Sequence, residues 1–423
     1  MSISKGPAHA PIFQRPECLD LTRPISYQNG HQWDAYARMR TDAPIFWHEQ
    51  PEPYEPGFWV ISRHAEISAV SKNPGLWSSA NGSHLMSLGD PETMDTAIIS
   101  AVVGNMVSMD PPEHTAYRRI ATSEFTPRKI SEYEQRIRTH CRETIDRIAA
   151  KGSCDFVLDV AQQLPLYTLS EIMGVPEEDR AQLIDWANML TGYEDPEFKL
   201  PDEEFIGAMM QIFDYGRWAM RGRRDNPKND LLSVIANSRI EDVELPDYVL
   251  DGFFLIMIVG GNETTRNTIS GGLLALDQYP EQREALIMDP SLIPNAAEEM
   301  LRWVSPVVYF ARRAKEDTVL SGQKIAAGEK VVMLYGSANR DESVFDDAER
   351  FDVRRRNAKE HLSFGVGQHF CLGSGFARLQ IRVMYEELLR RLPDIRAAEA
   401  PRRMQSNFIM GIKNLPAVFT PER

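Results

Sequence analysis

Cysteine is scarce in this chain, and its spacing excludes two kinds of metal site. The 423 residues contain four, Cys18, Cys141, Cys154 and Cys371, and no two of them form a CxxC pair. Structural zinc sites and iron–sulfur clusters need grouped thiolates, so the sequence predicts neither. A disulfide between Cys141 and Cys154 stays open as an alternative, although reduced thiols are the usual state in a cytosolic protein.

Long apolar runs and an excess of positive charge are also missing. The longest purely apolar run, Phe253 to Val259, is far shorter than a membrane span requires. The N-terminal stretch has no basic segment followed by an apolar one, so no signal peptide is predicted. The formal net charge is −14, which argues against nucleic acid and anionic membrane surfaces as partners. We therefore expect a cytoplasmic protein with no membrane or nucleic-acid partner.

Helical periodicity dominates what is present. Apolar spacing predicts helices near residues 32–41, 131–150, 176–190, 202–220 and 246–278. Short strand-like runs occur at 57–62, 318–320, 330–334 and 408–419. No repeat or linker divides the chain, so we expect one mainly α domain with small β-sheets over residues 1–423, of which 1–30 are irregular.

The stretch FGVGQHFCLG, residues 364–373, carries the clearest chemical signal. Cys371 lies in a glycine-punctuated loop, two residues after His369, and an amphipathic run of helical period follows at once. A helix N-terminus favours the thiolate form, and glycines let backbone N–H groups approach the sulfur. Such a loop suits an axial thiolate on a haem iron, whereas a lone cysteine before a helix is more often structural.

This loop resembles the haem-binding loop of the cytochrome P450 family. The resemblance runs from about Trp33 to the C-terminus and implies that family's triangular fold, with haem b between a long central helix and the cysteine loop. It implies that Cys371 is the iron ligand and that Phe364 and Gly373 bind the cofactor. It also implies a monooxygenase that hydroxylates its substrate with dioxygen, two electrons and two protons.

A second constellation interrupts the apolar stretch 253–276 with the sequence GGNETT. Two glycines within a helix cost roughly 1 kcal/mol each against alanine, which the close approach of a large flat ligand would offset. On its own the segment also fits a glycine-weakened helix end. The resemblance implies that Gly260 lies against the haem, that Thr264 hydrogen-bonds dioxygen and that Glu263 delivers protons.

Four basic residues are candidate partners of the two haem carboxylates. His114 and Arg118 stand four apart after a DPP turn and so share one helix face, which is otherwise typical of a solvated surface. The resemblance adds Arg312 and His369 to this set, with Arg313 as the alternative to Arg312.

A buried charge network is expected to support the haem pocket. Glu299 and Arg302 stand three apart, a spacing that is common for an exposed ion pair of little energy. The resemblance makes Glu299, Arg302 and Arg354 an interlocked structural triad.

The electrons must come from other proteins, because the chain has neither a G-x-G-x-x-G fingerprint nor cysteines for an iron–sulfur cluster. We expect a ferredoxin and its reductase, with NADH or NADPH as the ultimate donor. Ferredoxins are acidic, so docking needs a local basic patch on the cysteine side of the haem. Four arginines, which are otherwise scattered surface charges, are the candidates: Arg119, Arg128, Arg378 and Arg382.

The substrate pocket is expected to be apolar, which suits a terpenoid, a steroid or an alkyl chain. The resemblance places residues 83–105 and five apolar side chains around it: Ile256, Val259, Val307, Val308 and Ile409. Each of these side chains could instead belong to the core. A monomer is expected. The competing functions are a peroxide- or nitric-oxide-using haem-thiolate enzyme and a non-catalytic haem sensor or ligand carrier.

Overall fold

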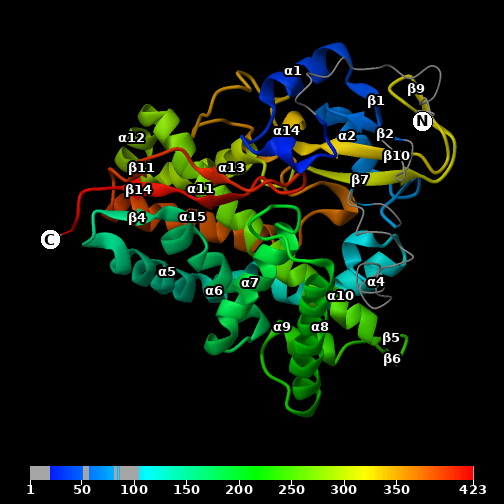
Figure 1. Cartoon of the computed structure of the whole chain (residues 1–423), viewed down its shortest axis with the longest axis horizontal. Helices are drawn as coiled ribbons and strands as arrows, with labels where there is room; N and C mark the ends of the chain where they lie inside the picture. Colours follow the sequence, from blue (N-terminus) through cyan, green and yellow to red (C-terminus); the bar gives the residue numbers. More distant parts are fainter. Residues whose placement is uncertain (1–19, 51–56, 81–82, 84, 86–103, 423) are drawn as a thin grey trace.

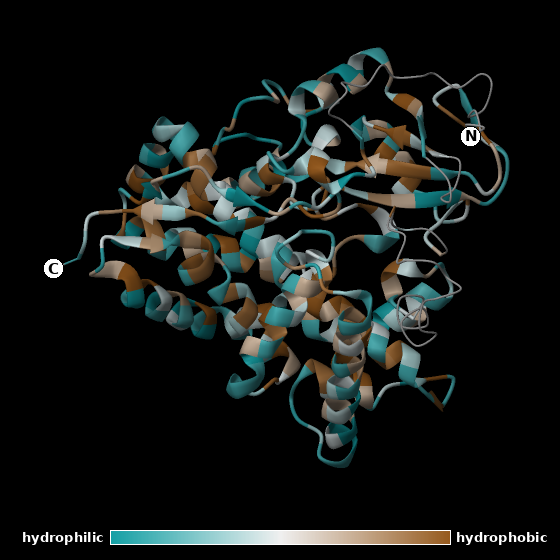
Figure 2. Ribbon diagram, viewed as in Figure 1, coloured by the Kyte–Doolittle hydropathy of each residue, from teal (hydrophilic) through white to brown (hydrophobic). Residues whose placement is uncertain are grey.

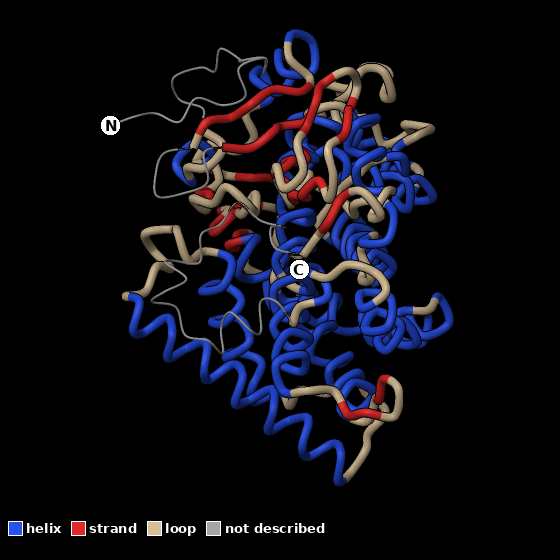
Figure 3. Tube along the Cα trace, turned by 90° about the vertical axis from the view of Figure 1, so that its right-hand side faces the viewer, coloured by secondary structure: helices blue, strands red, loops and turns tan. Residues whose placement is uncertain are grey.

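The computed structural model describes residues 20–50, 57–80, 83, 85 and 104–422 of the chain (Figure 1). Helices form most of it, and most of the strands lie in the upper half of Figure 3, apart from one short pair lower down. The expected mainly α fold with small sheets is confirmed. In the described part of the chain, no helix combines the length and the apolar character that crossing a membrane requires.

The helices follow the predicted ranges closely. In chain order they are α1 (Trp33–Asp42), α2 (His64–Lys72), α4 (Glu113–Thr122), α5 (Pro127–Ala149), α6 (Gln163–Met173), α7 (Arg180–Thr191), α8 (Asp202–Asp225), α9 (Leu231–Ala236), α10 (Asp247–Gly261), α11 (Glu263–Gln278), α12 (Pro280–Met288), α13 (Ile293–Val304), α14 (Tyr335–Ala338) and α15 (Ser374–Arg391).

The largest sheet has the strand order β1-β2-β10-β7-β3. These strands are β1 (Ile45–Glu49), β2 (Gly57–Ile61), β10 (Lys330–Leu334), β7 (Tyr309–Ala314) and β3 (Trp77–Ser78). The smaller sheets pair β4 (Ser153–Asp155), β14 (Pro416–Val418) and β11 (Arg396–Ala397); β12 (Arg402–Arg403) and β13 (Ile412–Asn414); β5 (Arg239–Ile240) and β6 (Val243–Glu244); and β8 (Thr318–Leu320) and β9 (Gln323–Ile325).

Local sequence explains how α5 begins and which face it buries. Thr126 caps the helix by accepting from the N–H of Lys129 at 3.4 Å, and Pro127 occupies the first turn, where its missing N–H costs nothing. The apolar face, which includes Ile137 and Ile145, packs against α15. Figure 2 shows the apolar segments gathered where the elements face one another, with polar turns outside. This stack supports the helix that follows the cysteine loop.

Two predicted elements are divided in the structure. The stretch 246–278 forms α10 and α11, which meet at Asn262 (φ −106°, ψ −65°) directly after two glycines. The stretch 408–419 is not one strand: it holds β13 and β14, and Ile409 pairs with Val307 in an isolated bridge. The irregular backbone at the α10–α11 junction lies next to the cavity described below.

The described cysteines are unpaired. Cys141, Cys154 and Cys371 are all free thiols, so no disulfide joins Cys141 to Cys154, and Cys18 lies outside the described residues. Most of the predicted 83–105 pocket segment and residues 1–19 of the irregular N-terminal segment also lie outside them.

Candidate active site

One internal cavity, of about 260 Å3, brings together Cys371, Thr264 and all of the predicted cofactor-binding residues. The α10–α11 junction supplies Gly260 and Thr264, the cysteine loop supplies Phe364 and Cys371, and α15 begins directly beyond it. Segments more than a hundred residues apart in the chain therefore meet around one space.

The cysteine loop is shaped by glycine. Gly365 and Gly367 have φ angles of 65° and 79°, and a Cβ at Gly367 would lie 2.5 Å from the Ser71 carbonyl oxygen. The N–H of Cys371 donates to the Phe364 carbonyl at 2.8 Å, which closes the loop. These contacts fix the direction in which the sulfur points.

Burial raises the pKa of the Cys371 thiol, and the surroundings oppose that rise. The backbone N–H of Gly373 lowers this pKa most, followed by the guanidiniums of Arg118 and Arg378 and the N–H of Ser374. These are the donors expected at the N-terminus of α15. The site therefore offers a sulfur ligand whose anionic form has nearby positive partners.

The predicted basic set lines one rim of this cavity. His114 is buried, and neither of its ring nitrogens has a hydrogen-bond partner among the described residues. Its ring lies 4.1 Å from that of His369, which contacts Ser79 Oγ at 3.0 Å. Burial, together with Arg118 and Arg312, lowers the pKa of His114 to about 4.

The two arginines of this rim have free donors. Arg118 donates to the Phe370 carbonyl at 2.5 Å, and Arg312 donates to the carbonyl of its neighbour Ala311 at 2.7 Å. Within the described part of the chain, neither forms an ion pair with a carboxylate. Arg312 is buried and Arg118 is half-buried. A buried cation without an anionic partner is costly, so this rim is suited to a ligand that carries carboxylates.

The α10 wall of the cavity is open at Gly260. A Cβ on this residue, which lines the cavity, would meet no atom within 4 Å. Thr264 Oγ1 donates to the Gly260 carbonyl at 3.1 Å, and Thr268 Oγ1 donates to the Thr264 carbonyl at 2.9 Å. Only the first of the two glycines marks open space, because a Cβ on Gly261 would lie 2.9 Å from the Leu169 side chain.

Glu263 lies elsewhere than the sequence suggests. Its side chain is fully buried but does not line the cavity, because Arg266 on the same helix pairs with it. Arg266 in turn donates to Asn188 of α7 at 3.1 Å. Burial raises the pKa of Glu263, and Arg266 opposes this. The acid is thus held behind Thr264, against α7.

Comparison with known proteins identifies the family. The family model for cytochrome P450 matches residues 177–414. The chain belongs to the cytochrome P450 family. It is 39% identical to linalool 8-monooxygenase of Pseudomonas putida, over 97% of this chain and all of the relative. It is 35% identical to the steroid C26-monooxygenase of Rhodococcus jostii, over 94% and 84% of the two chains.

Comparison with solved structures leads to the same family. A cytochrome P450 of Mycobacterium marinum, solved in complex with pseudoionone, superposes with a TM-score of 0.86 at 36% identity and covers 92% of this chain and 94% of its own. The present chain is therefore a cytochrome P450 monooxygenase, and its cofactor is haem b. Enzymes of this family need a redox partner.

The cavity fits this cofactor. Cys371 offers the thiolate, and Gly260 leaves open space. Among the residues that the structure describes, the two arginines of the rim have no carboxylate partner and the nitrogens of His114 have no hydrogen-bond partner. These features belong to this chain and are independent of the family match.

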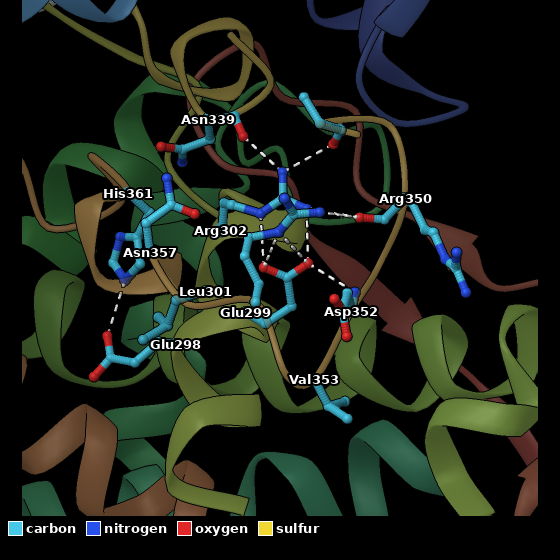
Figure 4. Close-up of polar contacts among 12 residues, drawn as sticks. Glu298, Glu299, Leu301, Arg302, Asn339, Arg350, Asp352, Val353, Asn357 and His361 are labelled. Atoms are coloured by element: carbon cyan, nitrogen blue, oxygen red, sulfur yellow. Dashed lines mark hydrogen bonds and ion pairs between the residues drawn. The ribbon is translucent and has the colours of Figure 1, made fainter. Parts of the chain in front are cut away.

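The predicted structural triad is wrong by one residue. Glu299 accepts from Arg302 at 2.7 and 2.8 Å (Figure 4). The third member is Arg355, which donates to Glu299 at 3.1 and 3.2 Å. Arg354 is exposed. The carboxylate of Asp352 accepts the Arg354 N–H at 2.9 Å, and this turn directs Arg354 outward and Arg355 inward.

The predicted substrate residues divide into two groups. Ile256 and Val307 line the cavity, whereas Val259, Val308 and Ile409 are absent from its described lining. Val308 faces a separate core cluster beneath the large sheet, because alternate residues of an extended chain point to opposite sides.

Sequence reasoning missed further apolar lining residues. The structure adds Leu169 and Ile172 of α6, Met257 of α10 and Phe310 of β7. In the sequence these positions are typical of ordinary core. Only the packing of their elements around the cavity shows that they line it.

The four arginines expected at a partner face have different environments. Arg119 is exposed and forms no ion pair with any described residue, and Arg128 is 92% exposed beside Glu132 at 3.8 Å. Arg378 and Arg382 instead form ion pairs, with Glu298 at 2.7 Å and with Glu134 at 2.8 Å respectively.

Proposed function

We propose that this cytochrome P450 takes electrons from a separate ferredoxin and hydroxylates an apolar small molecule of the terpenoid, steroid or alkyl type. The observation that carries the substrate class is the apolar lining on the substrate side, including Ile256, Val307, Phe310 and Leu169. The names of two relatives, a linalool 8-monooxygenase and a steroid C26-monooxygenase, point in the same direction. An apolar cavity binds by removing ligand surface from water and has few groups that orient a polar substrate.

When bound, haem supplies the activation of dioxygen and the insertion of one oxygen atom into a C–H bond. Cys371 would hold the iron from one side, and His114, Arg118, Arg312 and His369 would orient the cofactor through its carboxylates. Shielding of the cavity by apolar side chains keeps bulk water from the reacting centre.

Thr264 and Glu263 would deliver protons to the reacting centre. The Thr264 hydroxyl faces the cavity and can give up its bond to the Gly260 carbonyl in order to donate to an oxygen ligand. Glu263 stands directly before it in the chain and is the nearest acid in α11. Because Arg266 holds its carboxylate away from the cavity, delivery requires either a turn of this side chain or a bridging water.

Docking of the ferredoxin would rely on the arginines that are most exposed to solvent. Arg119 in the last turn of α4 and Arg128 at the N-terminal end of α5 present charge to solvent, whereas Arg378 and Arg382 are held in closer ion pairs. The net charge of −14 makes such a local patch necessary for an acidic partner.

The function is tested by reconstitution of the haem-loaded protein. Carbon monoxide on the dithionite-reduced protein should give the red-shifted Soret band of a thiolate-ligated haem. A panel of one terpenoid alcohol, one steroid and one fatty acid is then screened for spin-state shifts, and any binder is incubated with ferredoxin, reductase and NADH. A hydroxylated product supports the proposal.

Two other outcomes would overturn it. Turnover with hydrogen peroxide but none with several ferredoxins would indicate a peroxide-using enzyme. Tight binding without turnover by any donor would indicate a ligand carrier or sensor.

A further inference from the structure

Arg378 has a different environment from the one that its sequence position suggests. It lies in α15, seven residues after Cys371, and its side chain is 33% exposed. The guanidinium donates to Glu298 of α13 from Nε at 2.7 Å and from Nη2 at 3.1 Å. A two-pronged contact of this kind fixes the plane of the guanidinium.

Glu298 is held from a second side by His361 (Figure 4). The His361 Nε2 lies 3.2 Å from Glu298 Oε2, and its Nδ1 accepts from the N–H of Ser363 at 3.1 Å. The ring proton therefore resides on Nε2, and a neutral His361 donates to the carboxylate. This cluster joins α13 and α15 to the segment that enters the cysteine loop.

The guanidinium of Arg378 also contacts the first residue of that loop. Its Cζ lies 4.6 Å from the centroid of the Phe364 ring, which is the distance of a cation–π interaction. Phe364 lines the cavity, and its carbonyl accepts the N–H of Cys371 at 2.8 Å. Arg378 thus contacts a residue that both borders the cofactor site and holds the backbone of Cys371.

We propose that Arg378 is a positioning residue for the thiolate ligand. Supported by Glu298 and His361, it keeps Phe364 and the loop in place and sets a positive charge next to the segment that carries Cys371. Charges and hydrogen bonds around a haem thiolate tune its reduction potential. A nearby cation stabilises the added electron, so Arg378 raises the potential. This role is independent of the electron donor.

The test compares Arg378→Met with Arg390→Met, both loaded with haem. Arg390 is also an ion-paired arginine of α15, but it bonds Glu387 at 2.7 Å, and its side chain is 60% exposed. We expect Arg378→Met to have a more negative reduction potential than the wild type. Its reduced carbon monoxide complex should also lose the red-shifted Soret band several-fold faster. Arg390→Met should match the wild type in both measurements.

Arg378→Lys separates charge from geometry. Lysine retains the charge but cannot form the two-pronged contact, so its potential should stay near the wild-type value while the Soret band still decays faster. The proposal is overturned if Arg378→Met behaves like Arg390→Met, or if Arg378→Lys shifts the potential as far as Arg378→Met does. If Arg378→Met takes up no haem, the lysine variant decides by the same two readouts: a shifted potential or a wild-type band lifetime overturns the proposal.

Discussion

Arg355 donates its Nε to both carboxylate oxygens of Glu299, at 3.1 and 3.2 Å, and so ties the segment before the cysteine loop to α13. Its remaining nitrogens donate to the backbone carbonyls of residues 346, 347 and 350. Both side chains of the pair are buried, so water cannot replace the partner of either charge.

Removal of Arg355 should therefore destabilise the protein strongly. Removing one partner of a buried ion pair costs about 3–5 kcal/mol of stability, whereas a surface substitution changes stability by about 0.5 kcal/mol or less. We expect Arg355→Ala to lower the unfolding midpoint and the haem content, and the exposed neighbour Arg354→Ala to do neither. Urea unfolding of both variants measures the difference; equal effects would contradict the assignment.

Glu263→Gln should separate proton delivery from binding. Glutamine keeps the size of the side chain and can still accept from Arg266, but it carries no proton to deliver. General acid catalysis contributes roughly 100-fold or more, so product formation with ferredoxin should fall by about that factor. Spin-state titrations with substrate should be unchanged. The exposed Glu284→Gln on α12 is the control, and a Glu263→Gln enzyme with wild-type turnover would exclude this role.

The cysteine loop and the helices could be predicted because their signals are local. The glycines around Cys371 and the apolar period of α5 lie within one stretch of sequence, and the structure places both as expected. The direction of a single side chain is different. Arg354 and Arg355 are indistinguishable in sequence, and only the turn at Asp352 decides which one is buried.

Long-range contacts set the remaining details. Glu263 faces away from the cavity because Arg266 and, through it, Asn188 of another helix hold it. Val308 misses the cavity because the strand that follows it joins the large sheet, which fixes the face on which each residue lies. No short sequence pattern records either contact.

Gly260 and Gly252 should respond in opposite ways to an added methyl group, although both lie in α10. Alanine at a helix glycine gains up to about 1 kcal/mol, and at Gly260 the Cβ meets nothing, so Gly260→Ala should fold as well as the wild type. It should, however, weaken substrate binding several-fold, because the methyl group enters the cavity. At Gly252 the Cβ would lie 2.6 Å from the backbone of Gly104, and overpacking should cost about 1–3 kcal/mol.

Thermal unfolding and spectral titration of these two variants separate the effects. If Gly260→Ala binds substrate with the wild-type affinity, the space beside this glycine does not belong to the ligand site.

Charge reversal at Arg128 should weaken ferredoxin docking. Arg128 lies at the N-terminal end of α5, and the exposed Arg147 near its other end is 19 residues, or roughly 28 Å, away. We expect Arg128→Glu to raise the KM for ferredoxin several-fold at low ionic strength and less at high ionic strength. Arg147→Glu changes the net charge equally and should leave the KM unchanged. Equal effects of the two reversals would show a general charge effect and no docking face.

His31 should make the protein less stable as the pH falls. Its Nε2 lies 2.9 Å from the Ser305 carbonyl oxygen, and burial, together with Arg340 and Arg403, lowers its pKa from 6.5 to about 3. Between these two values the unfolded chain binds a proton that the folded chain does not. Stability is therefore full above pH 6.5 and falls with decreasing pH, by up to about 1.4 kcal/mol per pH unit.

Glutamine at position 31 tests the direction in which stability changes with pH. Its amide can donate to the same carbonyl but does not titrate, so His31→Gln should be less stable than the wild type near neutral pH and lose less on acidification. The other titrating groups are common to both proteins and cancel in the difference between their free energies of unfolding. The two stability curves should therefore converge as the pH falls toward about 5, and curves that stay parallel would show that His31 is protonated in the folded protein.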